Sequence, residues 1–244
     1  MTAVVIVGAQ WGDEGKGKIV DYYTESAQVV VRYAGGPNAG HTLVVGDDKL
    51  VVRLLPSGIL RPTTKCILGQ GMVIDAKVLL GEIDQLTERG FGDLGSRLML
   101  SDRAHMIFPY HLTIDALRET ALGQTKAIGT TKKGIGPAYE DKARRTGIRA
   151  GDLADLNRLT ELIEAALEAW RPTLKALGGD SPSARAIVDE LAPLAARLVP
   201  LLGNASRAAD EAVTSGKNVM FEGAQETLLD IDHVTVGPYI RNTL

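Results

Sequence analysis

The sequence predicts an α/β protein with a mainly parallel, phosphate-loop-like sheet flanked by helices and a helical subdomain late in the chain. Three observations predict this fold class. The chain opens with an apolar run at residues 4–7 that leads through a glycine-rich turn into a helical pattern. Apolar runs of strand length then recur between helical segments, and residues 152–216 are dominated by helical spacing. Alternating strands and helices build parallel sheets, so we expect residues 1–244 to form one nucleotide-binding domain.

Short apolar runs along the chain have the length and composition of buried parallel strands. They are rich in valine, isoleucine and leucine, and glycine or polar residues bound them. We expect strands at residues 3–7, 28–33, 66–68, 97–100 and 218–221. Two further β-rich runs within residues 43–55 flank Gly46, Asp47 and Asp48, which predicts a hairpin.

Helical spacing of apolar residues predicts the helices. Val78, Leu79, Ile83 and Leu86 share one face of the second helix, and Gly90 is its stop signal. We expect helices at residues 15–24, 75–89, 155–178 and within 181–216. Residues 123–151 are rich in glycine, threonine, lysine and arginine without a strong period, so we expect a long loop there, and such loops often serve function.

Composition excludes several classes of protein. The chain has 244 residues and a net charge of −3, so no global basic field suggests nucleic acid as a partner. No apolar run approaches the roughly 18 residues that span a membrane, and no signal-peptide pattern precedes the first strand. The single cysteine, Cys66, excludes a disulfide within the chain and is expected to be a buried thiol. We therefore expect a cytoplasmic protein that binds neither nucleic acid nor membrane.

The first candidate site is the turn after the first strand. From Gly12 to Lys18 the chain fits the G-x-x-x-x-G-K spacing of a phosphate loop. Its glycines let backbone N–H groups face an anion, and the following helix N-terminus adds partial positive charge. Ile19 stands where such loops place the Ser or Thr that holds Mg²⁺, so Asp13 is the nearest candidate metal ligand. The alternative is a glycine turn that merely links strand to helix.

The second candidate site is the turn at residues 38–42. His41 is flanked there by small and polar residues, and a histidine can exchange a proton near neutral pH. A lone histidine is more often structural, and both interpretations stay open at this point. His105 and His111 lie in apolar surroundings, and His233 follows two aspartates in a segment that suits either a metal or a hydrogen-bonded turn.

The third candidate site is the glycine- and threonine-rich stretch at residues 129–137. Thr130 and Thr131 stand beside Lys132 and Lys133, and more basic residues follow. Hydroxyl and backbone N–H groups beside lysines suit a phosphate monoester. A solvated basic loop explains the same pattern equally well.

Four segments in order resemble one family, adenylosuccinate synthetase. They are residues 10–18, residues 35–42, residues 129–139 and residues 221–225. The resemblance implies GTP-dependent ligation of IMP and L-aspartate with Mg²⁺ as cofactor, the first committed step from IMP toward AMP. It also implies a homodimer in which Arg145 reaches the IMP site of the partner subunit.

The resemblance implies a role for each matching residue. Asp13 would remove the N1 proton of IMP, His41 would be the general acid, and Gln225 would complete the catalytic set. The implied Mg²⁺ ligands are Asp13 and the backbone carbonyl of Gly40. GTP would be bound by Gly12, Asp13, Glu14, Gly15, Lys16, Gly17, Lys18, Gly40, His41 and Thr42. IMP would be bound by Asp13, Glu14, Gly15, Lys16, Asn38, Ala39, Gly40, His41, Thr131, Arg145 and Gln225.

Two departures accompany the resemblance. The family is longer than these 244 residues, so we expect this chain to lack the part that supplies aspartate and guanine contacts. Glu226 stands where the family has glycine, and residues 234–241 no longer follow the pattern. The alternative hypothesis is a non-catalytic GTP- and IMP-binding module or an inactive fragment. The presence of both Asp13 and His41 favours the enzyme.

Overall fold

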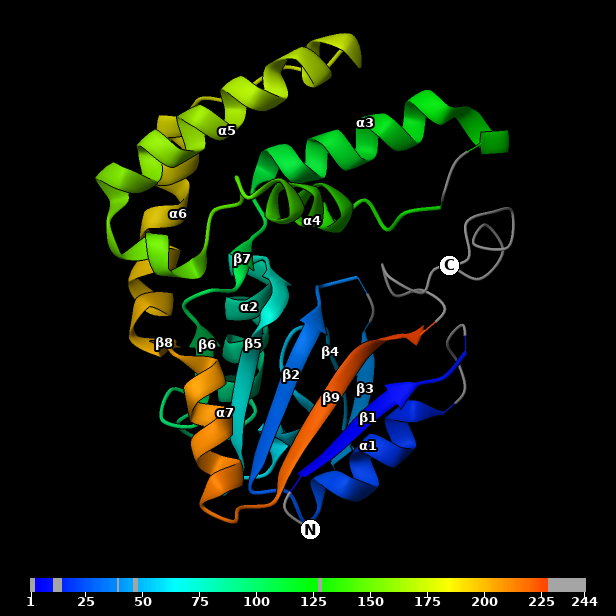
Figure 1. The fold of residues 1–244 in the computed structure, drawn as a ribbon, viewed down its shortest axis with the longest axis vertical. Coiled ribbons are helices and arrows are strands. Elements are labelled where there is room, and N and C mark those ends of the chain that lie inside the picture. Colours follow the sequence, from blue (N-terminus) through cyan, green and yellow to red (C-terminus); the bar gives the residue numbers. More distant parts are fainter. Residues whose placement is uncertain (1–2, 11–14, 39, 46–47, 127–128, 228–244) are drawn as a thin grey trace.

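A computed structural model describes residues 3–10, 15–38, 40–45, 48–126 and 129–227. Within these ranges, the side chains at positions 41, 43–45, 48–50, 124–126 and 225–226 lie outside the description. The described chain forms a mainly parallel sheet with helices on both faces (Figure 1). This confirms the predicted fold class.

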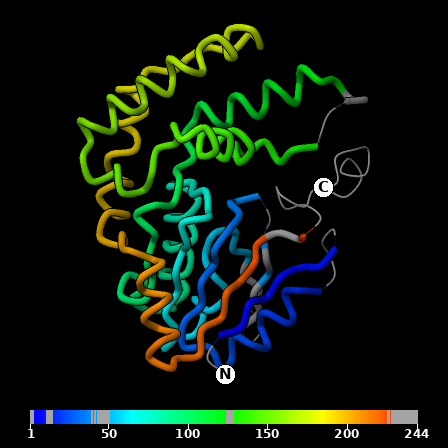
Figure 2. Tube along the Cα trace, in the orientation of Figure 1, coloured from blue at the N-terminus to red at the C-terminus, as the bar shows by residue number. Residues whose placement is uncertain are grey.

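The main sheet has the strand order β1-β9-β2-β5-β6-β8, with β7 paired to β5, and every one of these pairs is parallel. The strands confirm the predicted runs and add β7 and β8. Strand β9 inserts between β1 and β2, and Figure 2 shows these strands from opposite ends of the chain lying side by side. The strands are β1 (Ala3–Gly8), β2 (Val29–Gly35), β5 (Lys65–Ile74), β6 (Leu98–Ser101), β7 (His105–Met106), β8 (Leu202–Gly203) and β9 (Val219–Glu226).

A separate antiparallel hairpin, β3 (His41–Val45) and β4 (Asp48–Val52), follows β2. The helices are α1 (Lys16–Thr24), α2 (Ala76–Glu88), α3 (Pro109–Lys126), α4 (Ile135–Arg144), α5 (Leu156–Ala176), α6 (Ala184–Leu198) and α7 (Ala205–Thr214). Short 3-10 helices lie at η1 (Ser57–Leu60), η2 (Ala150–Ala154) and η3 (Val199–Leu201). The predicted hairpin and first helices are confirmed within a few residues, and Asp75 caps α2 by accepting from two backbone N–H groups.

The expectation of a long loop over residues 123–151 is wrong. Helix α3 extends to Lys126, and α4 occupies residues 135–144 in the middle of that stretch. Its glycines and charged residues give α4 the composition of a loop. In the structure Ala138 is buried with Val73 and Ile107, and Ile135 and Tyr139 pack against them. Tertiary packing of one apolar stripe thus outweighs the weak helical propensity of the segment.

The two faces of the sheet are covered by different helices. On one face, Val20 of α1 and Leu79 of α2 pack in the same core as Ile6 and Leu68. On the other face, the alanines of α7 pack against Val31 and other strand residues. Helix α7 therefore covers the sheet, whereas α5 and α6 pack against each other beside it.

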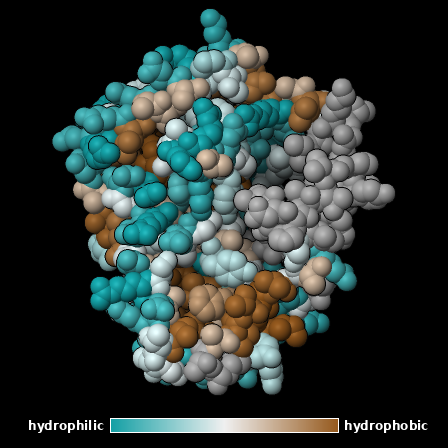
Figure 3. Space-filling model, in the orientation of Figure 1, coloured by the Kyte–Doolittle hydropathy of each residue, from teal (hydrophilic) through white to brown (hydrophobic). Residues whose placement is uncertain are grey.

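Strand β1 is an edge strand among the described residues, since β9 is its one partner there. Its Val5 and Val7 side chains are 61% and 55% exposed. In the same orientation, Figure 3 shows apolar side chains gathered over the strands in the lower half of the molecule. The α7 helix leaves this part of the sheet face uncovered (Figure 1).

Candidate functional site

The turns singled out in the sequence gather at one edge of the sheet. Strands β1, β2 and β9 are parallel neighbours, so their carboxyl ends lie together at the edge where α/β proteins bind ligands. The Lys16 Nζ donates a hydrogen bond to the carbonyl oxygen of Gly223 at 2.9 Å. The Thr227 hydroxyl donates to the carbonyl oxygen of Gly8 at 2.8 Å. The first and last of the predicted segments are thereby joined directly.

The turn that ends β2 packs tightly against β9. Gly35 has a φ of +87°, and a Cβ placed on it would lie 2.5 Å from the Cβ of Ala224. A side chain at Gly35 would meet both a disfavoured backbone conformation and a direct clash. Only glycine fits this position without displacing β9 from β2.

Helix α4 brings the third predicted segment next to the same turn. The Tyr139 hydroxyl accepts a hydrogen bond from the Gly35 N–H at 3.0 Å and donates to the Gly71 carbonyl at 2.9 Å. A Cβ on Gly36 would lie 3.2 Å from Cδ1 of Ile135, the first residue of α4. The residue 129–134 segment and the β2 turn are therefore neighbours.

The hairpin β3–β4 holds His41 at the start of a strand rather than on a turn. His41 pairs with Val52, and Thr42 pairs with Val51. Gly40 is exposed, and a Cβ on it would lie 2.6 Å from Cγ1 of Val51. The Val51 side chain of the neighbouring strand therefore leaves no room for a side chain at Gly40.

A buried carboxylate that the sequence analysis missed holds the segment after this hairpin. Glu82 of α2 accepts from the backbone N–H groups of Arg53 at 2.7 Å, Leu54 at 3.1 Å and Leu55 at 3.0 Å. Glu82 is 5% exposed. In the sequence, Glu82 lies on the same helix face as the apolar Leu79 and Leu86, which indicates a buried carboxylate. A buried charge requires hydrogen-bond partners.

The described residues among the remaining site predictions are accessible. Asn38 and Lys16 are half-buried. Gly15, with a φ of +85°, is the N-cap residue of α1. The predicted residues Gly17, Lys18, Thr42, Thr131 and Arg145 are exposed.

The structure does not bring Arg145 together with Thr131. Arg145 ends α4 with a φ of +65°, and Thr131 precedes that helix. Ten helical residues separate the two by about 15 Å along the axis. Gly12, Asp13, Glu14, Ala39 and His233, and the side chains of His41 and Gln225, lie outside the described residues.

His111 belongs to a buried structural network. Its Nδ1 accepts from the Phe108 N–H at 3.0 Å, so the ring is neutral and its Nε2 donates to Asp141 at 3.0 Å. Trp170 Nε1 also donates to Asp141, at 3.0 Å. Burial lowers the pKa of His111, and the hydrogen bond to Asp141 offsets this only in part. Burial would raise the pKa of Asp141, but the two donors outweigh it and hold this pKa below its usual range.

His105 and Cys66 are buried as well. Burial, together with the charge of Lys142, lowers the pKa of His105 to about 4. Cys66 is fully buried, as predicted, and burial raises the pKa of its thiol. These groups, like His111, support the core rather than the sheet edge.

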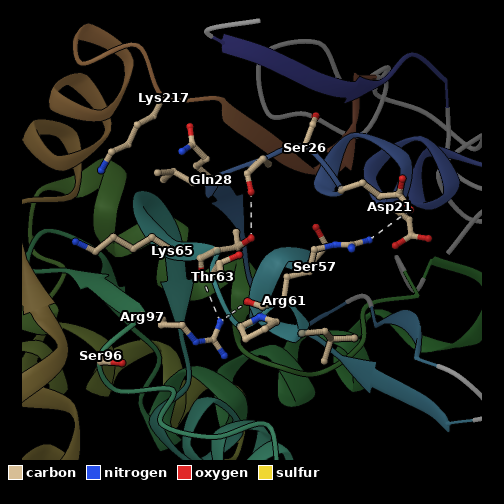
Figure 4. A pocket seen from close by; sticks show the side chains of 16 residues that line it. Asp21, Ser26, Gln28, Ser57, Arg61, Thr63, Lys65, Ser96, Arg97 and Lys217 are labelled. Carbon is tan, nitrogen blue, oxygen red and sulfur yellow. Dashed lines mark hydrogen bonds and ion pairs between the residues drawn. The ribbon is translucent and has the colours of Figure 1, made fainter.

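A pocket of about 880 Å³ lies at the opposite edge of the sheet, where β2, β5 and β9 begin (Figure 4). Arg97 belongs to the framework of this pocket and donates to the carbonyl oxygens of Ile59 at 3.1 Å and Arg61 at 2.7 Å. Arg61 in turn lies 3.8 Å from Glu25. Because its lining residues lie where these strands begin, the pocket is separate from the candidate site at their carboxyl ends.

The described part of the chain holds neither a ready-made metal cluster nor a membrane-spanning helix. Among the described residues, no group of three or more His, Cys, Asp or Glu side chains is placed to hold a metal ion. In the same part of the chain, none of the helices combines the length and apolar character needed to cross a membrane.

A doubly wound parallel sheet with glycine-rich turns at the carboxyl ends of neighbouring strands defines an α/β protein of the phosphate-loop-like class. The family model of adenylosuccinate synthetase matches residues 5–242. The chain therefore belongs to the adenylosuccinate synthetase family, as the resemblance implied. The match extends through residues 234–241, where a departure from the family pattern was expected.

Curated relatives match the whole chain. It is 60% identical to the adenylosuccinate synthetase of Sorangium cellulosum over 243 residues and 51% identical to that of Myxococcus xanthus over 249 residues. These alignments cover 100% of this chain but 56% and 57% of the relatives. The chain thus spans a little over half the length of the curated relatives that it matches.

Solved structures agree with this assignment. The fully ligated adenylosuccinate synthetase of Plasmodium falciparum matches with a TM-score of 0.87 and 38% identity, covering 98% of this chain and 55% of that one. The succinoaminodeoxyadenylate synthetase of cyanophage S-2L, bound to dGMP and dATP, matches with a TM-score of 0.59 and 26% identity, covering 97% and 55%. The sheet and its helices are therefore those of the family.

Proposed function

We propose that this chain carries the GTP- and IMP-binding part of an adenylosuccinate synthetase. The reaction joins IMP and L-aspartate to adenylosuccinate while GTP becomes GDP and phosphate, the first committed step of AMP synthesis from IMP. One observation supports this most directly: the turns beside Lys16, Gly35 and Gly223 meet at the carboxyl edge of β1, β2 and β9. Such an edge suits a nucleotide's phosphates.

In this proposal the catalytic groups act on IMP held beside GTP. Asp13 removes the proton from N1 of the purine, and O6 attacks the γ-phosphate of GTP to give a 6-phosphoryl intermediate. His41 is the general acid, and Gln225 contacts IMP. The amine of aspartate then displaces phosphate. Positioning and charge stabilisation supply most of the rate acceleration, as in phosphoryl transfer generally.

The nucleotide contacts follow from the same assignment. The GTP phosphates are bound by residues 12–18 and 40–42, where the start of α1 contributes partial positive charge. IMP is bound by residues 13–16 and 38–41 together with Thr131 and Gln225. Arg145 is exposed at the end of α4. That position suits the proposed homodimer, in which this arginine serves the partner's IMP.

In this proposal a magnesium ion is bound near the hairpin. Mg²⁺ commonly takes one or two protein oxygens and completes its shell with water and phosphate, so no large carboxylate cluster is needed. Gly40 is exposed at the start of the hairpin, and its backbone carbonyl is the second proposed ligand. In this proposal Asp13 and that carbonyl hold the ion, which neutralises phosphate charge when bound.

The domain organisation is also a proposal. Residues 1–244 act as one nucleotide-binding domain in which the helices of residues 152–216 are a subdomain. We place the protein in the cytoplasm, where its nucleotide substrates occur. The rest of the family's length is expected to contribute the contacts to aspartate and guanine.

Binding of the two nucleotides is the direct test. Titration calorimetry of the purified chain is expected to give saturable binding of IMP and of GTP with Mg²⁺. A chain that binds neither nucleotide, while melting cooperatively, would contradict the proposal. Product formation from IMP, GTP, Mg²⁺ and aspartate, followed by absorbance, then shows whether this chain turns over without the remaining part of the family sequence.

The rival proposal is a nucleotide-binding module without chemistry. It predicts GTP binding that survives Asp13→Ala and is unaffected by IMP. The synthetase predicts coupling, because Asp13 faces both nucleotides in the proposed site. A titration of GTP with and without saturating IMP, in the unaltered chain and in Asp13→Ala, separates the two.

A further inference from the structure

Two acidic side chains of α3, Asp115 and Glu119, are buried although each carries a carboxylate. They are 7% and 9% exposed and stand one helical turn apart on the same face. Like charges at this spacing repel each other, and burial disfavours a charged group. Such a pair is stable only when both carboxylates accept hydrogen bonds.

Both carboxylates accept from the backbone of the residue 129–134 segment. Asp115 Oδ2 accepts from the Gly134 N–H at 2.9 Å, and Glu119 Oε1 accepts from the Gly129 N–H at 2.5 Å. One face of α3 thus holds both ends of the segment by hydrogen bonds. Directly after it the chain enters α4, whose Tyr139 is tied to Gly35.

The middle of the segment faces outward. Thr131 and Lys132 are exposed, and Lys132 has a φ of +55°. The hydroxyl of Thr130 is buried and has no hydrogen-bond partner among the described residues. The segment therefore presents the Thr131 hydroxyl and the Lys132 ammonium on a backbone whose two ends are anchored.

This arrangement limits which groups of the segment can contact a phosphate monoester. The N–H groups of Gly129 and Gly134 are occupied by carboxylates, so they are not available to an anion. Contacts to phosphate are left to residues 130–133. Anchored ends lower the ordering entropy that binding must overcome, which favours affinity for a small anion.

We propose that Asp115 and Glu119 are positioning residues that hold the residue 129–134 segment in its phosphate-binding shape. The inference rests on the proposed function, in which this segment binds the 5′-phosphate of IMP through Thr131. Neither carboxylate touches the nucleotide. Their effect is specific to IMP, because GTP phosphates are assigned to the turn before α1.

The test compares variants that keep or remove the acceptor oxygen. Asp115→Asn and Glu119→Gln retain one carbonyl oxygen, whereas Asp115→Leu and Glu119→Met retain none at similar size. Glu140→Gln is the matched control, because Glu140 joins α4 to α3 through Arg118 at 2.7 Å without contacting the segment. Each variant is titrated with IMP and with GTP and Mg²⁺, and its melting temperature is measured.

We expect Asp115→Leu and Glu119→Met to weaken IMP binding about tenfold or more, the loss typical of a buried N–H left without an acceptor. Their GTP affinity is expected to stay within about twofold of that of the unaltered chain. The Asp115→Asn, Glu119→Gln and control variants are expected to bind IMP nearly as tightly as the unaltered chain does. Equal losses of IMP and GTP affinity would indicate a merely structural role and overturn the inference. So would IMP binding that is unchanged in every variant.

Hydrogen exchange gives a readout that needs no nucleotide. The amides of peptides covering residues 129–134 are expected to exchange faster in Asp115→Leu and Glu119→Met than in the control. Unchanged exchange would overturn the anchoring itself. If the unaltered chain binds no IMP, the proposed function fails instead, and the exchange data still report whether the segment is held. If one variant does not fold, the substitution at the other position decides.

Discussion

The ammonium of Lys16 and the carbonyl oxygen of Gly223 are joined by a hydrogen bond of 2.9 Å across 207 residues of sequence. Lys16 begins α1, at the end of the glycine-rich turn, and Gly223 lies in β9. An ammonium has three donors, so Lys16 can keep this contact and still reach a phosphate. The contact aims a long, flexible side chain at the sheet edge where the nucleotide is proposed to bind.

Replacing Lys16 by methionine keeps the length of the side chain and removes its charge. We expect Lys16→Met to weaken GTP binding about tenfold or more, because a charge-assisted contact to phosphate is lost. Lys217→Met is the control, since Lys217 lies in the pocket at the opposite edge of the sheet (Figure 4). Titration calorimetry with GTP and Mg²⁺ measures both, and equal affinities would remove Lys16 from the proposed site.

Glu82 is expected to stabilise the protein through the segment after the hairpin. In Glu82→Gln one oxygen becomes an NH₂ group, so at least one buried N–H among residues 53–55 loses its acceptor. The cost is about 1–3 kcal/mol in the free energy of unfolding. Glu88→Gln, on the exposed side of the same helix, is expected to change it by less than about 0.5 kcal/mol. Urea denaturation compares the two, and similar stabilities would exclude this anchoring role.

Gly223 has no room for a side chain. A Cβ there would lie 2.9 Å from the Ile6 carbonyl oxygen and 2.9 Å from the Tyr33 hydroxyl. Gly223→Ala is expected to lower the free energy of unfolding by about 1–3 kcal/mol, because β9 must move away from β1. Gly81→Ala in α2, where a Cβ meets no atom within 4 Å, is expected to raise it by about 0.5–1 kcal/mol. Thermal melts in which both variants shift alike would refute the clash.

The buried histidines predict that acid destabilises the fold. Burial and nearby Lys142 lower the pKa of His105 to about 4, below the ordinary value of 6.5. Below pH 6.5 His105 therefore binds a proton in the unfolded chain but stays neutral in the folded chain, so the free energy of unfolding falls as the pH drops to about 4. His111 acts in the same direction, since its pKa is also lowered.

The His105 contribution can be isolated by substitution. Between about pH 7 and about pH 4.5, we expect the free energy of unfolding to fall by about 1–3 kcal/mol less in His105→Gln than in the unaltered chain, because the titrating group is absent. The free energy of unfolding at both pH values, in both proteins, measures the difference. A pH dependence that is identical in the two proteins would show that other groups, such as the His111–Asp141 pair, account for it.

The sequence predicts much of the fold, because strands buried on both faces and amphipathic helices leave local patterns. The apolar run at residues 66–68 indicates a strand, although β5 runs from Lys65 to Ile74. Helix α4 leaves only a weak pattern, since its apolar stripe of Ile135, Ala138 and Tyr139 is short and lies among glycine, proline and charged residues. Its helical state depends on packing against Val73, which no local pattern reveals.

The candidate site was predictable only in part. Motif spacing identified Lys16, Gly35 and Thr131, because phosphate binding requires glycines and cations in close sequence. It did not identify Asp115, Glu119 or Glu82. Their partners are backbone N–H groups of other segments, and a carboxylate inside a helical pattern does not reveal which backbone it meets.

The sequence by itself determined the family, the class of fold and the turns that carry the proposed chemistry, because each depends on residues close together in the chain. Only the tertiary structure decided that β9 lies between β1 and β2 and that Gly223 thereby meets Lys16. An apolar run indicates a strand, yet it specifies neither the neighbours nor the burial of each face, and Val5 and Val7 of β1 are exposed. The neighbours are chosen by packing and hydrogen bonding across the whole sheet.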